Sequence, residues 1–307
     1  MKKIHSRFSV ARGFLIFWTL FIGIGAVAGA ACMLIKPDGS LMGMQGLLPY
    51  FQVLPLAEIL YQDYLFPGIA LLCVNGLPNL LAAALLLRQR KAGVALGGGL
   101  GITLMLWICI QFVIFPINFL DIAFFSFGIL QAVTGYAAWV FCRQEQFTVS
   151  AADYPHIGTN PKRLVVYFSR MGYTKKLALE QAEKTGAEVY EIQTTERTAG
   201  TLGFWWCGRY GMHGWAMPIK PVTVELSCYE QVVICSPIWV FGLAGPVRSF
   251  CKEAKGKIKS ADFILTHHTR MHYAGAAREM ERLIGSSANR VISVSCPLGK
   301  QTGIAVF

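Results

Sequence analysis

The sequence is short of charge. Lysine, arginine, aspartate and glutamate make up 15% of its 307 residues, whereas soluble domains carry about 25%. Acidic residues are the scarcer kind, 17 against 28 basic ones, which leaves a formal net charge of +11. Because 54% of the residues are apolar, the chain can bury ample surface, and a disordered chain is excluded. The apolar residues are also clustered, which excludes a simple soluble globule.

Cysteine motifs are missing as well. The nine cysteines are scattered, and none forms Cys-x-x-Cys or has the spacing of a zinc finger. An odd, dispersed set argues against a disulfide framework and favours a reducing compartment around the polar half of the chain. No metal site is expected. The glycine patterns of the P-loop and of dinucleotide-binding folds are absent, and nothing indicates a nucleic-acid partner.

Four long apolar runs occupy the first half of the chain. They cover residues 13–35, 64–87, 94–115 and 122–141. Each is long enough to cross a hydrocarbon core of about 30 Å as a helix. Residues 1–143 hold 13 charged side chains and residues 144–307 hold 32. We therefore predict a four-helix transmembrane bundle over residues 1–143.

Eight of the nine basic residues in this half lie on one side of the predicted spans, and Lys36 lies on the other. The eight precede the first span, follow the second and follow the fourth: Lys2, Lys3, Arg7, Arg12, Arg88, Arg90, Lys91 and Arg143. The positive-inside rule then places both termini in the cytoplasm, for a multi-pass protein of the inner (cytoplasmic) membrane. The small residues before Cys32 suggest a cleavage site, but three further spans favour an uncleaved anchor.

Glycines and one asparagine inside the spans indicate where the helices pack closely and where one of them bends. Gly25 and Gly29, and likewise Gly97 and Gly101, are four residues apart, which predicts close helix packing within one bundle. Asn75, next to Gly76, predicts a kink with a hydrogen-bonding side chain. No ionisable residue stands at mid-span, which disfavours a transporter.

The stretch 36–44, with Phe66-Pro67-Gly68 and 74–76, is similar to a group of small bacterial four-span membrane proteins without an assigned function. This resemblance implies architecture only.

The second half has the pattern of an α/β domain. Residues 144–162 are polar, contain two prolines and are predicted to be a linker. Strands are expected at 163–168, 187–192, 229–235, 261–266 and 290–295, with helices at 174–185, 245–256 and 274–285. This alternation predicts a doubly wound parallel sheet over residues 163–307. Ligands of such sheets bind at the carboxyl ends of the strands. No helix is expected after the fifth strand, so the linker, the membrane domain or a partner would cover that face.

The first of these strand ends has the chemistry of an anion cradle. Ser169 and Thr174 supply hydroxyls, Gly172 is small, and a helix begins at Thr174. Backbone N–H groups and the helix dipole favour a phosphate there.

This loop carries a second resemblance. Tyr167-Phe168-Ser169-x-x-Gly172-x-Thr174 resembles the phosphate loop of the flavodoxin family. Residues 233–239, followed by 245–250, resemble its second flavin loop. The resemblance covers roughly residues 162–296 and implies strand order 2-1-3-4-5 and non-covalently bound FMN. A third loop, 266–273, is where that family contacts the flavin edge.

The resemblance implies the following FMN contacts, with no catalytic residue predicted: Ser169, Arg170, Met171, Gly172, Tyr173 and Thr174; Pro237, Ile238, Trp239, Val240, Phe241 and Gly242; His267, His268 and Thr269. The pair His268 and His272 also fits a zinc site by spacing, but a flavin-facing or substrate-facing role is favoured. Residues 196–220 form a long segment rich in aromatic residues and glycine. Two interpretations stay open for it, a lid over the cofactor or a segment docking on the membrane interface.

We therefore predict a membrane-tethered FMN protein that carries electrons from a cytoplasmic donor to a quinone or a membrane redox partner. A similarity to menaquinone-dependent protoporphyrinogen oxidases, carried by the fold and the first loop, implies the quinone. One alternative is an NAD(P)H:quinone oxidoreductase. Two others are a redox sensor and an interaction domain without flavin on a membrane anchor.

Overall fold

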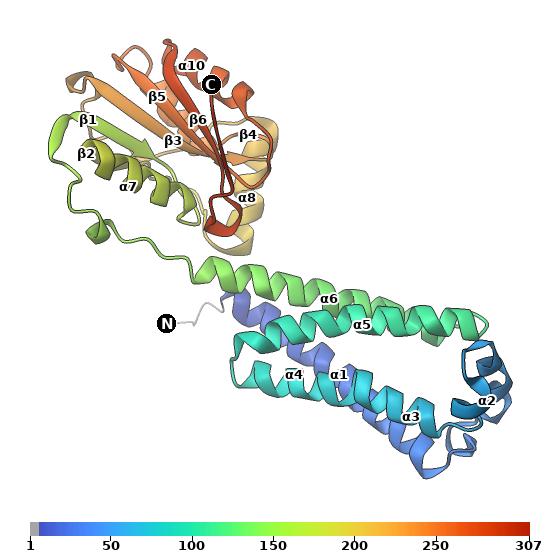
Figure 1. Cartoon of the computed structure of the whole chain (residues 1–307). Coiled ribbons are helices and arrows are strands. Elements are labelled where there is room, and N and C mark those ends of the chain that lie inside the picture. The colour runs from blue at the N-terminus through green and yellow to red at the C-terminus, as the bar shows by residue number, and fades with distance from the viewer. Residues whose placement is uncertain (1–5) are drawn as a thin grey trace. The chain divides into compact units, whose positions relative to one another are not determined.

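The chain folds into two compact units, Met1–Cys142 and Arg143–Phe307, in a computed structural model that describes residues 6–307 (Figure 1). Lys2 and Lys3, which contribute to the predicted orientation, lie outside the described residues. The first unit is helical, and the second is a mixed sheet with helices on both faces.

Four helical segments of the first unit are long and apolar enough to cross a membrane. They are α1 (Arg7–Ile35), Leu65–Leu87, α5 (Lys91–Ile114) and α6 (Phe119–Glu145), with mean hydropathies of 2.1, 2.0, 2.0 and 1.4. The second segment is not one regular helix. It consists of α3 (Leu65–Leu71), a π-helical turn η3 (Leu72–Gly76) and α4 (Leu77–Leu87). The loop after α1 holds the short turns η1 (Ser40–Met42) and η2 (Gln45–Val53) and the helix α2 (Ala57–Leu60).

Glycines bring the backbones of α5 and α6 close together. A Cβ atom added to Gly101 would lie 2.5 Å from the backbone nitrogen of Ala132 and 2.7 Å from the carbonyl oxygen of Gly128. Gly135 and Gly98 meet in the same way through their Cα atoms. The expectation for Gly25 was wrong, because a Cβ there meets nothing within 4 Å. Its side of α1 is open, and helix rotation, not spacing alone, decides which glycine faces a neighbour.

A buried polar chain ties three of the helices together. The Gln131 amide donates to the Asn79 Oδ1 atom and to the Gly97 carbonyl, both at 2.8 Å, and the Asn79 amide donates to the Asn75 carbonyl. These bonds join α4, α5 and α6 at fully buried side chains, where water cannot compete. The predicted irregularity at Asn75 is present as the π-helical turn, but its side-chain amide has no partner among the described residues.

The sheet of the second unit has the order β2-β1-β3-β5-β6-β7, with β4 paired to β3. The strands are β1 (Asn160–Tyr167), β2 (Ala187–Glu191), β3 (Gln231–Trp239), β4 (Gly242–Leu243), β5 (Ala261–His267), β6 (Ala288–Ser295) and β7 (Gly303–Val306). The four pairings along β2-β1-β3-β5-β6 are parallel, whereas β7 pairs antiparallel with β6 and β4 pairs antiparallel with β3.

The five predicted strands correspond to β1, β2, β3, β5 and β6, which are parallel and stand in the predicted relative order 2-1-3-4-5, but the prediction of an all-parallel sheet of five strands was wrong. It omitted the hairpin strand β4 and the edge strand β7, into which the chain turns back after β6. Both are short, and their pairing depends on a neighbouring strand more than on their own composition.

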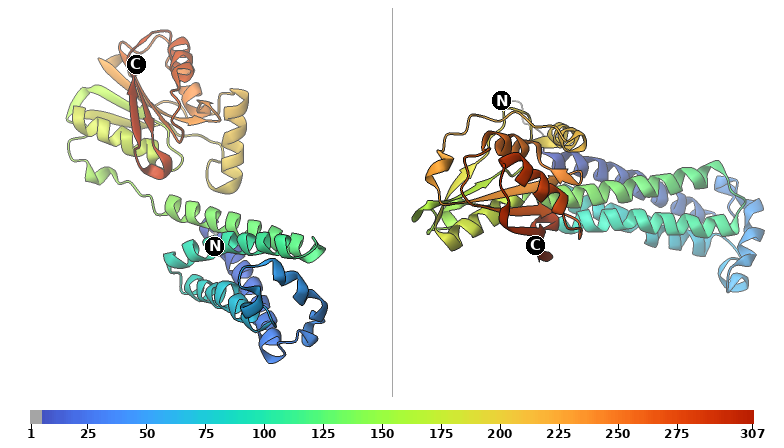
Figure 2. Two further views of the ribbon diagram at one scale, coloured as in Figure 1. Left: turned by 45° about the vertical axis from the view of Figure 1, so that its right-hand side comes forward. Right: turned by 90° about the horizontal axis from the view of Figure 1, so that it is seen from above.

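Helices cover the two faces of this sheet unequally (Figure 2). Alternate residues of β1 point to opposite faces. Leu164 and Val166 join a large core with α9 (Gly245–Glu253) and α10 (Ala274–Ile284), while Val165 and Tyr167 pack under α7 (Tyr173–Thr185). Ile157 of the predicted linker packs against the α7 side. The linker thus contributes to the face for which the sequence predicted no closing helix.

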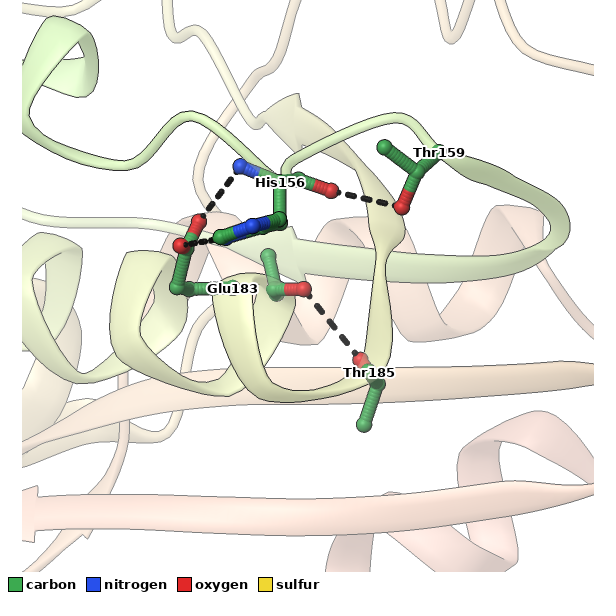
Figure 3. Close-up of polar contacts among 5 residues, drawn as sticks. His156, Thr159, Glu183 and Thr185 are labelled. Atoms are coloured by element: carbon green, nitrogen blue, oxygen red, sulfur yellow. Dashed lines mark hydrogen bonds and ion pairs between the residues drawn. The ribbon is translucent and has the colours of Figure 1, made fainter.

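The predicted linker is partly structured. It contains a 3₁₀ turn, η4 (Ala151–Asp153), and β1 begins inside it at Asn160. The Glu183 carboxylate of α7 accepts the backbone N–H of His156 at 2.9 Å and also contacts the His156 Nδ1 atom (Figure 3). The Thr159 hydroxyl donates to the His156 carbonyl at 2.8 Å. These contacts fasten the linker to α7.

Replacing Glu183 by glutamine is expected to loosen residues 150–158. The His156 hydrogen bond holds the pKa of Glu183 below its ordinary value of 4.5. A lowered folded-state pKa means that this carboxylate stabilises the attachment above pH 4.5, and that the contribution is lost as pH falls through the lower value. The protection factors of the linker amides, which correct for the intrinsic exchange rate at each pH, should therefore fall in Glu183→Gln at pH 7, and in the unmodified chain as the pH is lowered below 4.5. Glu180→Gln is the control, since Glu180 pairs with Lys176 on the same helix; an equal effect there would contradict the assignment.

Candidate functional site

The carboxyl ends of β1, β3 and β5 meet at one edge of the sheet and enclose a cavity of about 330 Å³. This is a size at which small-molecule sites begin. Each of the three following loops contributes to its walls, and α8 (Gly200–His213) forms a fourth wall.

The first loop opens α7 without a side-chain cap. Gly172 has a φ of 87° and precedes the helix, and the Ser169 hydroxyl accepts the Gly172 N–H at 3.0 Å. Glycine is the residue that adopts this left-handed conformation without strain. The first backbone N–H groups of a helix have no intrahelical acceptor. Tyr173 and Thr174, which line the cavity, therefore present unpaired N–H groups at the positive end of the helix dipole.

A pair of buried hydroxyls stands beside this helix start. The Thr174 and Thr266 Oγ1 atoms are 2.7 Å apart, and both residues line the cavity. Each hydroxyl has one proton, and their mutual bond uses one of the two. One hydroxyl proton is thus left to donate to a ligand.

The second loop supplies an apolar wall. Pro237, Ile238 and Trp239 line the cavity, and the Trp239 ring packs edge-on against Phe168 at 5.5 Å. The turn that follows is strained, because Val240 and Phe241 have φ values of 46° and 65°. Positive φ at both central residues is what a type I′ hairpin demands, and asparagine and glycine are the usual occupants. For a β-branched residue such backbone costs about 1–3 kcal/mol.

The third loop holds a histidine whose two ring nitrogens are both engaged. The His267 Nδ1 atom lies 2.8 Å from the Thr269 carbonyl oxygen, and its Nε2 atom lies 2.7 Å from the Ser293 hydroxyl. A carbonyl only accepts, so Nδ1 carries the proton and Nε2 accepts from Ser293. Burial lowers the pKa of His267 below 6.5. This imidazole is therefore neutral at pH 7 and fixed in one tautomer.

The fourth wall comes from a helix that the sequence did not predict as such. Phe204, Cys207 and Gly208 of α8 line the cavity, and the Arg170 guanidinium of the first loop lies 5.2 Å from the centre of the Phe204 ring. Burial raises the pKa of Cys207 to about 11, so its thiol stays protonated and is not a nucleophile at neutral pH.

The linker supports the first loop from outside the cavity. Phe147 packs edge-on against the Tyr173 ring, with 4.7 Å between ring centroids. A Cβ atom on Gly172 would lie 3.2 Å from the Phe147 ring, so a larger residue than glycine would displace this contact.

Most of the residues predicted to contact a cofactor come together here. Those that line the cavity are Ser169, Arg170, Met171, Tyr173, Thr174, Pro237, Ile238, Trp239, Val240, His267 and His268. Gly172, Phe241, Gly242 and Thr269 are not among its lining residues. Phe241 is 69% exposed at the tip of the turn, and the Thr269 carbonyl is engaged by His267.

The sequence-based list missed six lining residues: Gln144, Phe204, Cys207, Gly208, Thr266 and Cys296. Thr266 and Cys296 lie at or just after predicted strand ends, a position that could have indicated them. The α8 residues had only the aromatic and glycine-rich composition of their segment as a signal. Within residues 6–307, no three His, Cys, Asp or Glu side chains gather as metal ligands.

Comparison with known proteins gives partial similarities only. No family model and no curated protein matches the chain. A flavoprotein structure from Lactobacillus acidophilus, in complex with FMN, is 18% identical and covers 44% of this chain and 91% of its own, with a TM-score of 0.37. Inferred flavoproteins from Bacteroides eggerthii and Bacteroides uniformis are 21% and 20% identical. They cover 44% of this chain and 86% and 88% of their own, each with a TM-score of 0.38.

Proposed function

We propose that the α/β unit binds FMN non-covalently at the carboxyl edge of its sheet. The observation that carries the proposal is the uncapped start of α7, which shares a cavity with the Trp239 wall. Unpaired N–H groups and the helix dipole fit a phosphate. Trp239, with Pro237 and Ile238, offers the apolar surface that a flat ring system requires.

The residues of the chain would hold and shield this cofactor. Ser169 and the Thr174–Thr266 pair supply hydroxyls on the phosphate side, and Phe204 and Cys207 exclude water from the α8 side. FMN, when bound, supplies the redox chemistry, while the protein sets its position and surroundings. His267 is committed to the Thr269 carbonyl and Ser293, so it orients the third loop and has no proton to give at neutral pH.

The proposal extends to the first unit as the membrane anchor. Its helices carry exposed apolar side chains on their outer surface, among them Phe14, Ile102 and Leu106. A helix that is apolar all round is suited to lipid. By the positive-inside rule, the basic residues Arg12, Arg88 and Arg143 support a proposed orientation with both termini on the cytoplasmic side of the inner membrane. The flavin would then pass electrons from a soluble donor, NAD(P)H or a protein, to a quinone or a membrane partner.

The test is an absorption spectrum of the full chain purified in detergent, with the released cofactor identified and FMN and riboflavin affinities compared. We expect FMN at about one per chain and much weaker riboflavin binding, because the phosphate is what the α7 start recognises. If no flavin binds after addition of FMN, the FMN site is contradicted. If riboflavin binds as tightly as FMN, phosphate recognition by the start of α7 is contradicted.

A substitution sharpens this test. Thr174→Val should weaken FMN binding about 10- to 100-fold, since a hydrogen bond to a charged group contributes about 1.5–3 kcal/mol. Thr185→Val is the matched control: it removes a hydroxyl from the last turn of the same helix, where it bonds the Gln181 carbonyl. Equal losses in both variants would mean that the helix is destabilised and that Thr174 has no specific role.

A further inference from the structure

Helix α8 is built with its small residues inward and its large apolar residues outward. Gly203, Cys207 and Gly211 form the buried face, at a spacing of four residues. A Cβ atom on Gly211 would lie 2.8 Å from the Trp239 Cβ atom, and one on Gly203 would collide with the Thr198 backbone. The helix thus packs closely against the rest of the α/β unit through this face.

The opposite face of α8 is apolar and exposed. Leu202, Trp205 and Met212 are 64%, 69% and 68% exposed. The surface helix of a soluble protein has polar side chains in these positions. The helix sequence contains no acidic residue, and its one lysine or arginine is Arg209.

The tryptophans around this face combine an apolar ring with polar neighbours. The Trp206 Nε1–H donates to the Glu196 carboxylate at 2.8 Å, and the Arg209 guanidinium lies 5.3 Å and 5.4 Å from the ring centres of Trp206 and Trp215. Tryptophan combined with arginine is the composition of the membrane–water interface, where the rings lie at headgroup level.

The strained turn adjoins this helix and has the same character. Trp239, against which Gly211 packs, leads directly into Val240 and Phe241. Both side chains are exposed although their backbone is strained, and asparagine and glycine would relieve that strain. Val240 also lines the cavity, but the Phe241 ring is 69% exposed and lies outside it, so this ring points to a contact outside the unit.

We propose that the outer face of α8 and the Val240–Phe241 turn form an interfacial surface that lies on a phospholipid bilayer with anionic headgroups. Apolar side chains enter the acyl boundary, and Arg209 meets the headgroup charge. The proposal rests on the proposed function in one respect, that the same chain crosses this bilayer. Because Phe204, Cys207 and Gly208 of α8 line the cavity, this surface would hold the candidate site next to the bilayer.

The experiment uses the full chain in vesicles of phosphatidylcholine and phosphatidylglycerol that contain a phospholipid with a photoreactive group near its acyl carbonyl. After irradiation, mass spectrometry locates the labelled peptides. We expect label on residues 200–215 and 240–241 as well as on the four apolar helical segments. In the triple variant Leu202→Glu, Trp205→Glu, Met212→Glu, the amount of label on α8 should fall at least about five-fold, because charged side chains leave the acyl boundary. The variant should keep the label on α1 and α5.

The control variant Arg278→Glu, Arg282→Glu adds negative charge to the exposed side of α10 and should leave the α8 label unchanged. Labelled apolar segments with an unlabelled α8 would overturn this inference and leave the membrane anchor standing. No label on any segment would overturn the anchor itself. Cross-links between α8 of two chains in place of lipid adducts would assign the surface to a second copy, and so overturn the lipid assignment.

Discussion

Replacing Gly101 by leucine is expected to separate α5 from α6 and to destabilise the helical unit by about 3 kcal/mol. Overpacking usually costs about 1–3 kcal/mol, and this position belongs at the upper end because the obstructing atoms are backbone. The Ala132 nitrogen and the Gly128 oxygen cannot rotate away as a side chain would. The measurement is the midpoint of thermal unfolding in detergent.

The chain offers a matched control on the same helix. A Cβ atom on Gly99 meets nothing within 4 Å, so Gly99→Leu should leave the midpoint within about 1 °C of the parent. Gly25→Leu should be tolerated for the same reason, although the spacing of Gly25 and Gly29 suggested a packing face. A large loss in Gly99→Leu would contradict the α5–α6 contact as the cause.

Glu279→Gln is expected to destabilise the α/β unit by about 3 kcal/mol. The Glu279 carboxylate accepts from the Arg248 Nε atom at 2.5 Å and from its Nη2 atom at 3.0 Å. The Arg248 side chain is only 5% exposed, so removing its partner leaves a buried charge. Breaking such a pair costs about 3–5 kcal/mol, and the partial exposure of Glu279 places this case at the lower end.

Native-state hydrogen exchange of α9 and α10 measures this effect. The Arg248 Nη1 atom also donates to the Trp215 carbonyl at 3.1 Å, so the segment after α8 should lose protection as well. Glu253→Gln changes an exposed carboxylate at the end of α9 and serves as the control. The double variant Arg248→Met, Glu279→Leu should recover most of the stability, because the buried charge is gone. A double variant as unstable as Glu279→Gln would show that shape, not charge, causes the loss.

Elements whose pattern is local were predictable from sequence. Apolar length alone located the four helical segments, because a helix satisfies its backbone within its own residues. The β-branched runs at 163–168 and 261–266 marked β1 and β5, and the Ser169–Thr174 loop was placed at a strand end before the sheet was known. Within a parallel sheet, strand ends meet at one edge, so loops distant in sequence could be expected to share a site.

Features that depend on partners were not predictable in this way. Four glycines at 200, 203, 208 and 211 disfavour a helix by propensity, yet α8 forms because its small residues fit closely against Thr198 and Trp239. Strand β7 exists only by pairing with β6, and β4 only by pairing with β3. The bond between Thr174 and Thr266, 92 residues apart, likewise appears only in the folded unit.

The sequence by itself determined a helical apolar half, an α/β half and the three loops that carry the candidate site, since each follows from periodicity and composition along the chain. Only the tertiary structure decided which glycines contact a neighbouring helix, which short strands complete the sheet and that α8 closes the cavity. These depend on close contacts between segments distant in sequence, and such contacts leave little trace in any one of the segments.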